Sequence, residues 1–264
     1  MERSAGGEGP RGVLRPEQGA GLFTVTPVPP GPALAPFVEY HWIVCWDVTG
    51  RPPYEQQVLS HPSVHLVFEE PGPLLYGVNR GVYTRRLVDA GQVHGVKFLP
   101  GGFRGFTAGP VQELTDQVLP AARFFGPGVD ALNGEVLACE DTSEMVRLVE
   151  AFLPTPDADP LAAQIAEIVQ VMTADHMLLR VEQVAARFDL SPRTLQRLFA
   201  EYVGVSPKWV LRRARLQEAA QRADSGAVDW AALAADLGYA DQAHLTRDFT
   251  AVVGVPPTRY VRGG

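Results

Sequence analysis

Two short stretches of this sequence carry polar side chains of the types that hydrogen-bond to the edges of nucleic-acid bases. The first, residues 190–209, reads LSPRTLQRLFAEYVGVSPKW, and the second, residues 240–259, reads ADQAHLTRDFTAVVGVPPTR. In the major groove of DNA an arginine fork pairs with guanine, and a glutamine amide pairs with adenine. At an offset of 50 the two stretches agree at seven positions: Leu195/Leu245, Arg197/Arg247, Phe199/Phe249, Val203/Val253, Gly204/Gly254, Val205/Val255 and Pro207/Pro257.

The first stretch has the pattern of a short amphipathic helix. Ser191 is a good N-cap, and Pro192 suits the first helical position, where its missing N–H costs nothing. The helical period turns four residues inward: Leu195, Leu198, Phe199 and Tyr202. It leaves four polar residues outward: Arg193, Thr194, Gln196 and Arg197. In the second stretch Asp241 takes the N-cap place, and the outward residues are Gln242, Ala243, His244, Thr246 and Arg247.

Each short helix follows another helix at the distance of a tight turn. Residues 181–188 carry an apolar stripe before the first turn, and residues 230–239 do so before the second, where Gly238 is expected to stop the helix. The second turn is one residue longer than the first. Two short helices joined in this way predict a helix-turn-helix. Residues 207–223 contain no helix breaker after the opening proline, so we expect one long helix that holds the two pairs at a fixed separation.

The net charge of the whole chain, −7, conceals an uneven distribution. Residues 1–160 hold 11 Lys and Arg against 19 Asp and Glu, a net −8, whereas residues 161–264 hold 12 against 11, a net +1. Within 180–222 there are nine cations against four anions, a net +5. A local basic face suits phosphate binding, because counterion release depends on the contacting surface. The alternatives are a solvated helix face and helix pairs that only pack; the duplication disfavours the second.

From about residue 170 to 262 the sequence resembles the DNA-binding domain of the AraC/XylS family of bacterial transcription regulators. The resemblance rests on LSPRTLQRLFAEYVGVSPKWV and LAADLGYADQAHLTRDFTAVVGVPPTRY, and in the second a Gly-aromatic-x-Asp run, Arg-x-Phe and Gly-x-x-Pro follow in the family's order. It implies two helix-turn-helix units joined by a linker helix. The base-reading positions it implies are Arg193, Thr194, Gln196, Arg197, Gln242, Ala243, Thr246 and Arg247. We add His244 to them and predict contacts with the DNA backbone for Ser191, Lys208 and Arg212.

The two units differ in charge. Residues 223–264 carry three arginines against five aspartates, a net −2, and Ala243 is a blank at a position that could read a base. The first unit is therefore expected to supply most of the affinity for DNA, with the second unit tuning it.

The N-terminal part has the alternation of β-strands. Residues 37–48, FVEYHWIVCWDV, alternate with period two from Val38 to Val48, and residues 63–69 do the same. Further short apolar runs are separated by Gly, Asn and Pro: 74–78, 82–88 and 93–98. From about Val111 the pattern becomes helical. The fold class expected is α+β multidomain, with an N-terminal β-rich, cupin-like barrel followed by helices, and a C-terminal all-α domain of two helix-turn-helix units joined by a long linker helix.

The stretch LPTPDADP marks the boundary between these parts, because its three prolines break any helix and favour an extended linker. We expect a disordered tail at residues 1–20 and a sensory or dimerisation domain at 21–153. A linker at 154–160 then leads to a double helix-turn-helix domain at 161–264.

Several N-terminal side chains suit contact with a small-molecule effector: Trp42, His61, His65, Tyr76 and Arg104. The aromatic ones suit a core equally, and Arg104 also suits a surface ion pair. His61, His65 and Glu69 on one strand face, with His94 on another strand, are ligand types for zinc or iron, but the His-x-His pair of a cupin metal site is missing. We expect no metal and no cofactor. Without a phosphate loop, a Gly-x-Ser-x-Gly motif or a usefully spaced Cys-His pair, we also expect no enzyme.

These features predict a sequence-specific DNA-binding transcription regulator controlled by a small molecule or partner at its N-terminal domain. The partners expected are double-stranded DNA, an effector, RNA polymerase if the protein activates, and a second copy in a homodimer. No apolar stretch reaches the ~18 residues of a membrane span, and the first 20 residues lack a signal peptide, so we expect a cytoplasmic protein, nucleoid-associated when bound. The alternative is a cupin-type small-molecule binding protein or enzyme whose helical domain recruits a protein partner.

Overall fold

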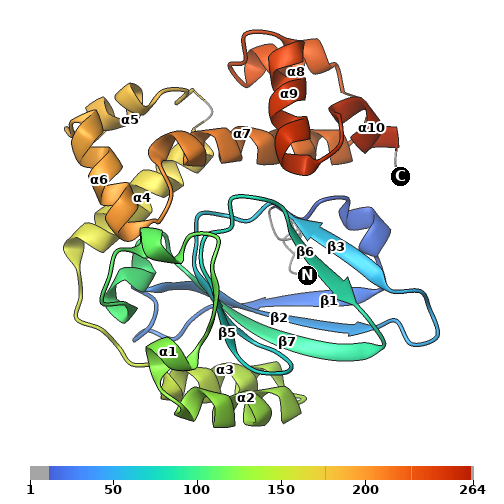
Figure 1. The fold of residues 1–264 in the computed structure, drawn as a ribbon, viewed down its shortest axis with the longest axis vertical. Helices are drawn as coiled ribbons and strands as arrows, with labels where there is room; N and C mark the ends of the chain where they lie inside the picture. Colours follow the sequence, from blue (N-terminus) through green and yellow to red (C-terminus); the bar gives the residue numbers. More distant parts are fainter. Residues whose placement is uncertain (1–11, 176, 227, 263–264) are drawn as a thin grey trace, which may run out of the picture.

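The computed structural model describes residues 12–175, 177–226 and 228–262, with strands in the N-terminal half and helices in the C-terminal half (Figure 1). The strands are β1 (Phe23–Val28), β2 (Val38–Asp47), β3 (Tyr54–Val58), β4 (His65–Phe68), β5 (Leu74–Tyr76), β6 (Tyr83–Leu87), β7 (Ala90–Phe98) and β8 (Val118–Pro120). The helices are α1 (Ala122–Phe125), α2 (Gly128–Ala138), α3 (Thr142–Phe152), α4 (Pro160–Ala174), α5 (Val181–Arg187), α6 (Pro192–Tyr202), α7 (Pro207–Asp224), α8 (Trp230–Asp236), α9 (Gln242–Val253) and α10 (Pro257–Arg262). Short 3-10 turns are η1 (Pro16–Gly19), η2 (Gly102–Phe106) and η3 (Val111–Leu114).

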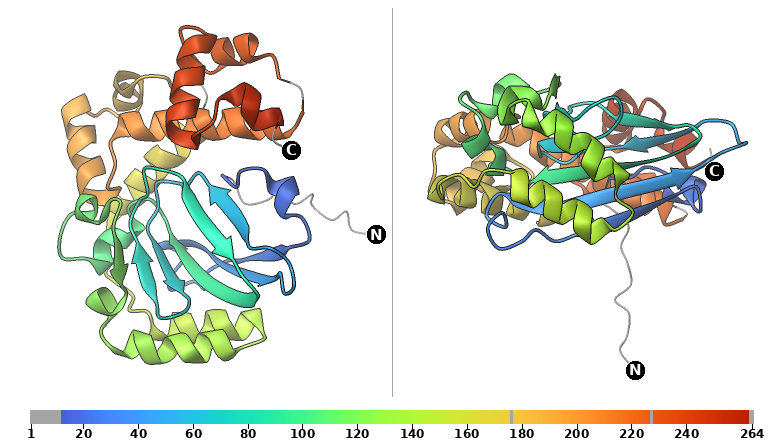
Figure 2. Two further views of the ribbon diagram at one scale, coloured as in Figure 1. Left: turned by 45° about the vertical axis from the view of Figure 1, so that its right-hand side comes forward. Right: turned by 90° about the horizontal axis from the view of Figure 1, so that it is seen from below.

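Six antiparallel strands form the main sheet in the order β1-β2-β7-β4-β5-β8. Because successive side chains of a strand point to opposite faces, one face of this sheet is apolar and packs against α2 and α3. These two helices lie side by side along that face (Figure 2). Ile43, Phe68 and Val96 from the sheet share this core with Val136 and Met145 from the helices.

A second sheet, β3 with β6, covers the other face of the main sheet. Arg85 of β6 forms an ion pair with Glu69 beyond β4 and lies over the Trp46 ring of β2, while Tyr83 contacts Tyr76 edge-on at 5.8 Å between ring centroids. The predicted β-rich architecture is confirmed. Neither sheet closes on itself within the described part of the chain, so the closed, cupin-like barrel is not confirmed.

His65 and His94, two of the histidines considered as metal ligands, lie on opposite faces of the main sheet. His65 pairs with Lys97 across β4 and β7, whereas His94 pairs with Phe68, three register steps away and on the helix-facing side. His61 precedes β4 and lies outside any strand. In the described residues no group of three or more His, Cys, Asp or Glu is placed to hold a metal ion.

A buried chain of hydrogen bonds runs instead from β7 to α3. The His94 Nε2 and His41 Nδ1 atoms are 3.0 Å apart, and His41 Nε2 lies 3.1 Å from Glu150 Oε1. Glu150 also accepts a hydrogen bond from the Gly31 N–H at 2.7 Å. Both imidazole side chains are fully buried. This chain ties the sheet to α3 through polar contacts in an otherwise apolar core.

Part of the segment predicted as an N-terminal tail packs against the rest of the chain. Residues 1–11 lie outside the described residues, but Val13 forms a β-bridge with Val58, and Leu14 is 2% exposed. The Arg15 guanidinium lies 4.8 Å from the ring of Tyr260, and its backbone N–H donates to the Tyr260 hydroxyl. The apolar side chains of Val13 and Leu14, next to the cation of Arg15, allow this segment to pack on the folded chain. The composition of the segment alone did not indicate this packing.

The helical half packs closely on the strand-rich half (Figures 1 and 2). Leu14 and Leu59 share a core with α7, α8, α9 and α10, and Val78 shares one with α4, α5, α6 and α7. Arg104 of η2 forms an ion pair with Glu201 of α6 at 2.7 Å. No helix within these described ranges combines the length and the apolar character needed to cross a membrane.

Candidate nucleic-acid interface

The first candidate unit is the helix pair α5 and α6. The turn between them depends on Asp189, whose φ of 53° lies in the left-handed region that aspartate tolerates better than most residues. This conformation lets the Leu190 N–H donate to the Ala185 carbonyl at 2.9 Å, which closes the end of α5. The Val184 and Ala185 side chains are buried against α6. The predicted helix-turn-helix is therefore present, with its short turn.

Helix α6 begins as the sequence predicts. The Ser191 hydroxyl accepts from the Thr194 N–H at 3.0 Å, and Pro192 is at the first helical position. The inward residues Leu195, Leu198 and Phe199 are buried. Three of the four predicted readers point to solvent: Arg193, Gln196 and Arg197. The fourth, Thr194, is half-buried, and its hydroxyl lies 2.8 Å from that of Ser191, so it belongs to the cap.

The second candidate unit, α8 and α9, repeats this arrangement. Gly238, with a φ of 69°, takes the place of Asp189, and the Tyr239 N–H donates to the Ala234 carbonyl at 2.9 Å. Asp241 caps α9 by accepting from the His244 N–H at 2.6 Å. The connection spans residues 237–241, against 188–191 in the first unit. The predicted extra residue in the second turn is confirmed.

Replacing Gly238 by alanine is expected to destabilise the second unit by about 1–3 kcal/mol, because a Cβ at this positive φ is strained and overlaps the Leu179 side chain. Gly254 is the matched control, since its φ of 86° is also left-handed but no atom lies within 4 Å of a Cβ built there. Urea unfolding of both alanine variants measures the difference. Equal losses of stability in the two variants contradict a role for the Leu179 contact.

The outward set of α9 is less uniform than that of α6. Four of its predicted readers are exposed: Gln242, Ala243, His244 and Arg247. Thr246 is half-buried. The His244 ring lies edge-on to that of Tyr239, 5.1 Å between centroids, so its place is set by the turn residue before the helix. The exposed predicted readers of α9 therefore include one arginine, whereas those of α6 include two.

The long helix α7 joins the two units and spans Pro207–Asp224, close to the predicted 207–223. The basic side chains of α7 have different surroundings. Lys208 is exposed, whereas Arg212 forms a two-pronged ion pair with Asp248 of α9. Arg213 is buried and donates to the carbonyls of Arg80 and Gly81 in the N-terminal half. Burial, together with the charge of Arg212, lowers the pKa of Arg213 to about 10.

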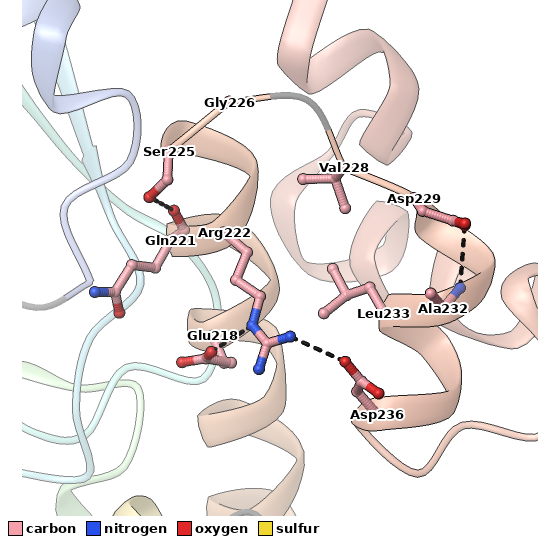
Figure 3. Close-up of a pocket in the computed structure, with 10 residues that line it drawn as sticks. All are labelled: Glu218, Gln221, Arg222, Ser225, Gly226, Val228, Asp229, Ala232, Leu233 and Asp236. Atoms are coloured by element: carbon pink, nitrogen blue, oxygen red, sulfur yellow. Dashed lines mark hydrogen bonds and ion pairs between the residues drawn. The ribbon is translucent and has the colours of Figure 1, made fainter.

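The C-terminal end of α7 also holds α8. The Arg222 side chain reaches between Glu218 of its own helix, at 2.7 Å, and Asp236 of α8, at 3.1 Å (Figure 3). These residues line a pocket of about 440 Å³ between the two helices. The N-terminal half of the linker helix therefore contacts the second unit through Arg212, and its C-terminal half does so through Arg222.

Residues 184–263 match a family described as a helix-turn-helix domain, of AraC type. The chain carries an AraC-type DNA-binding domain. Residues 26–120 match a family described as a domain of unknown function (DUF6597).

Individual proteins similar to this chain include regulators. A protein of Bacillus subtilis (strain 168) named "Uncharacterized HTH-type transcriptional regulator YfiF" is 27% identical over 137 residues, which cover 49% of this chain and 43% of that protein. The chain thus matches less than half the length of this curated relative. Among solved structures, the C-terminal domain of the response regulator AraT from Geobacillus stearothermophilus is 24% identical, over 41% of this chain and 88% of that one, with a TM-score of 0.37. ToxT from Vibrio cholerae O395 is 11% identical, over 91% and 96%, with a TM-score of 0.40.

Of the side chains predicted to meet an effector, His65 and Tyr76 are cross-strand partners on β4 and β5, and Trp42 lies beside His65. The Trp42 indole N–H donates to His65 Nδ1 at 3.2 Å, so these two are together. Tyr76 belongs to the cluster with Glu69, to which its hydroxyl donates at 2.5 Å. Arg104 is turned away, in its ion pair with Glu201.

His61 lines a groove between the strands and the AraC-type domain. This groove has a volume of about 1140 Å³; its walls come from β1, β2 and β7 on one side and from α4 on the other. Lys97 lies in it with its ammonium 2.9 Å from Glu39 and 5.0 Å from the centre of the Tyr40 ring. Lys97 was not predicted as a site residue, although a lysine in an apolar β-strand is itself a signal, because lysine is rarely buried without a partner.

Proposed function

We propose that this protein is a sequence-specific DNA-binding transcription regulator. The observation that carries the proposal is the presence of two capped helix-turn-helix units, each with exposed polar side chains at the start of its second helix, on one rigid linker. The 18 residues of α7 give a length of about 27 Å at 1.5 Å per residue. This length is of the same order as the roughly 34 Å that separates successive major-groove faces on one side of DNA.

Base reading is assigned mainly to the first unit. Arg193, Gln196 and Arg197 are exposed at the start of α6, where a helix N-terminus also favours phosphate. The second unit contributes Gln242, His244 and Arg247 with weaker electrostatic attraction, since residues 223–264 are net negative. Backbone contacts are assigned to Ser191 and Lys208, which flank α6 and are exposed.

Control by a small molecule is the second part of the proposal. The division proposed is a sensory or dimerisation domain at 21–153, cupin-like although its sheets are open, a linker at 154–160 and the DNA-binding domain at 161–264. The groove at His61 and Lys97 supports an effector site, because a molecule there touches both domains at once. Such a ligand shifts the DNA-binding equilibrium only as far as it binds one arrangement of the domains better than another.

The protein is proposed to act by binding and not by catalysis, in the cytoplasm, with RNA polymerase as a partner if it activates and with a second copy in a homodimer. Retention of specific genomic fragments at physiological salt tests the DNA-binding proposal. If no fragment is retained over competitor DNA, the proposal fails. Tightly bound zinc or iron in the purified protein would instead favour a metal-dependent binding protein or enzyme.

Filling the groove tests the effector site. Ala166 of α4 lines the groove, and Ala166→Trp is expected to abolish the rise in melting temperature that a metabolite screen gives with the wild-type chain. Ala231→Trp, at an exposed position of α8, is the control and should keep the response. A hit that stabilises Ala166→Trp as much as the wild type binds elsewhere.

A further inference from the structure

The ion pair between Arg212 and Asp248 joins the linker helix to the second recognition helix. The Arg212 Nε and Nη2 atoms lie 3.0 and 3.2 Å from the two carboxylate oxygens of Asp248. Both side chains are partly shielded, at 35% exposure for the arginine and 21% for the aspartate. A fork of this kind fixes direction as well as distance, because two parallel hydrogen bonds hold both groups in one plane.

A second arginine of α7, one turn further along, holds the turn in front of α9. The Arg215 guanidinium lies 4.7 Å from the centre of the Tyr239 ring, and Tyr239 is 5% exposed. The same ring contacts His244 edge-on. The linker therefore contacts the second unit both at its turn and at the middle of its recognition helix.

The first unit uses different chemistry at the matching place. At the offset of 50, Asp248 corresponds to Leu198, which is buried in the apolar core of the first unit. An aspartate on a recognition helix is unfavourable near phosphate, because like charges repel. Its presence there calls for a role that leucine cannot fill.

We propose that Arg212 and Asp248 are positioning residues, which lock the angle of α9 to the linker and so set the separation of the two recognition helices. The inference rests on the proposed DNA binding. It also reassigns Arg212, which the sequence predicted as a contact to the DNA backbone, to a contact within the protein. Arg215 supports the same lock through Tyr239.

The test is Asp248→Asn, with binding to a duplex selected from a random library by the wild-type chain. The substitution removes a negative charge from a DNA-binding unit, so charge alone predicts tighter binding. The positioning role predicts binding weaker by about 3- to 10-fold. Nuclease protection should be lost first over the half of the site that the second unit covers. Inserting one base pair between the two half-sites should cost the variant less affinity than it costs the wild type. Unchanged or tighter binding overturns the proposal.

Charge exchange separates positioning from phosphate contact. Arg212→Asp combined with Asp248→Arg keeps the net charge and is expected to recover most of the affinity and the wild-type slope of affinity against salt. If Arg212 touches phosphate, Arg212→Gln alone lowers that slope by about one unit and the exchange recovers nothing, which overturns the proposal. Glu182→Gln, at an exposed position of α5, is the control for charge and should leave binding within about 2-fold. If the wild-type chain selects no duplex, it is the DNA-binding proposal that fails.

Discussion

Alanine at both Arg193 and Arg197 is expected to weaken binding to the selected duplex by roughly 30-fold or more, because each arginine that reads a base contributes about 1–3 kcal/mol. Both side chains are exposed on the first two turns of α6, on the side opposite its buried residues. A guanidinium there can offer two parallel hydrogen bonds to guanine. Loss of these bonds should also relax the preference for the base at each position, which a pure phosphate contact would not do.

Fluorescence anisotropy at a fixed salt concentration measures this loss, and a panel of single-base changes measures the relaxed specificity. Arg247→Ala is the matched control, because Arg247 is the counterpart of Arg197 in the second unit. We expect it to weaken binding less. If the double arginine variant binds as the wild type does, α6 is not the reader; a larger effect of Arg247→Ala would reverse the order of the two units.

The recognition helices could be predicted from sequence because their signals are local. An N-cap side chain bonds to a backbone N–H three residues on, and inward residues recur at the helical period, so Ser191 and Asp241 mark helix starts without reference to the rest of the fold. The repeat then showed which residues are buried, since Phe199 and Phe249 both have no exposed surface.

The residues that each arginine of the linker helix contacts could not be predicted in this way. Consecutive helix positions point about 100° apart, so Arg212 meets α9 while Arg213 meets carbonyls of a loop more than 130 residues away. Arg215 lies over Tyr239. These partners come from tertiary packing, so the excess of +5 counted over residues 180–222 overstates the charge that faces DNA.

The β-rich half shows the same limit. Alternation and short apolar runs indicated β2, β4, β5, β6 and β7, whereas β1, β3 and β8 were not predicted. The face on which each histidine lies depends on strand pairing and position in the ladder, which are non-local. His65 and His94 therefore lie on opposite faces of the main sheet. Closure of a sheet depends on the partners of its edge strands, here β1 and β8, and no pattern within one strand encodes them.

These buried histidines predict that the folded state loses stability as the pH falls below about 6.5. Burial, with the nearby charge of His41, lowers the pKa of His94 to about 3, and burial, with Lys97 and His61, lowers the pKa of His65 to about 3. In the unfolded chain a histidine titrates near 6.5. Between these pH values the unfolded state binds protons that the folded state does not, so the free energy of unfolding falls by about 1.4 kcal/mol per pH unit for each such histidine.

The hydrogen-bond geometry of His94 is consistent with its lowered pKa. If His41 donates from Nε2 to Glu150, its Nδ1 must accept, and His94 then donates from Nε2. The added proton would go to His94 Nδ1, which is buried without a hydrogen-bond partner, near the Phe68 ring. A charged imidazole there would lack both water and an acceptor.

Urea unfolding at pH values from 7.5 to 5 measures the effect. His94→Gln keeps an amide that can donate to His41 but does not titrate, so we expect the variant to lose about 2 kcal/mol less than the wild type between pH 6.5 and 5. His65→Gln should behave in the same way if the first variant folds poorly, and His244→Gln, at an exposed position, should follow the wild-type curve. A wild-type stability that stays constant over this range, or a His94→Gln variant with an unchanged slope, would contradict the prediction, because it would mean that folding does not lower the pKa of His94.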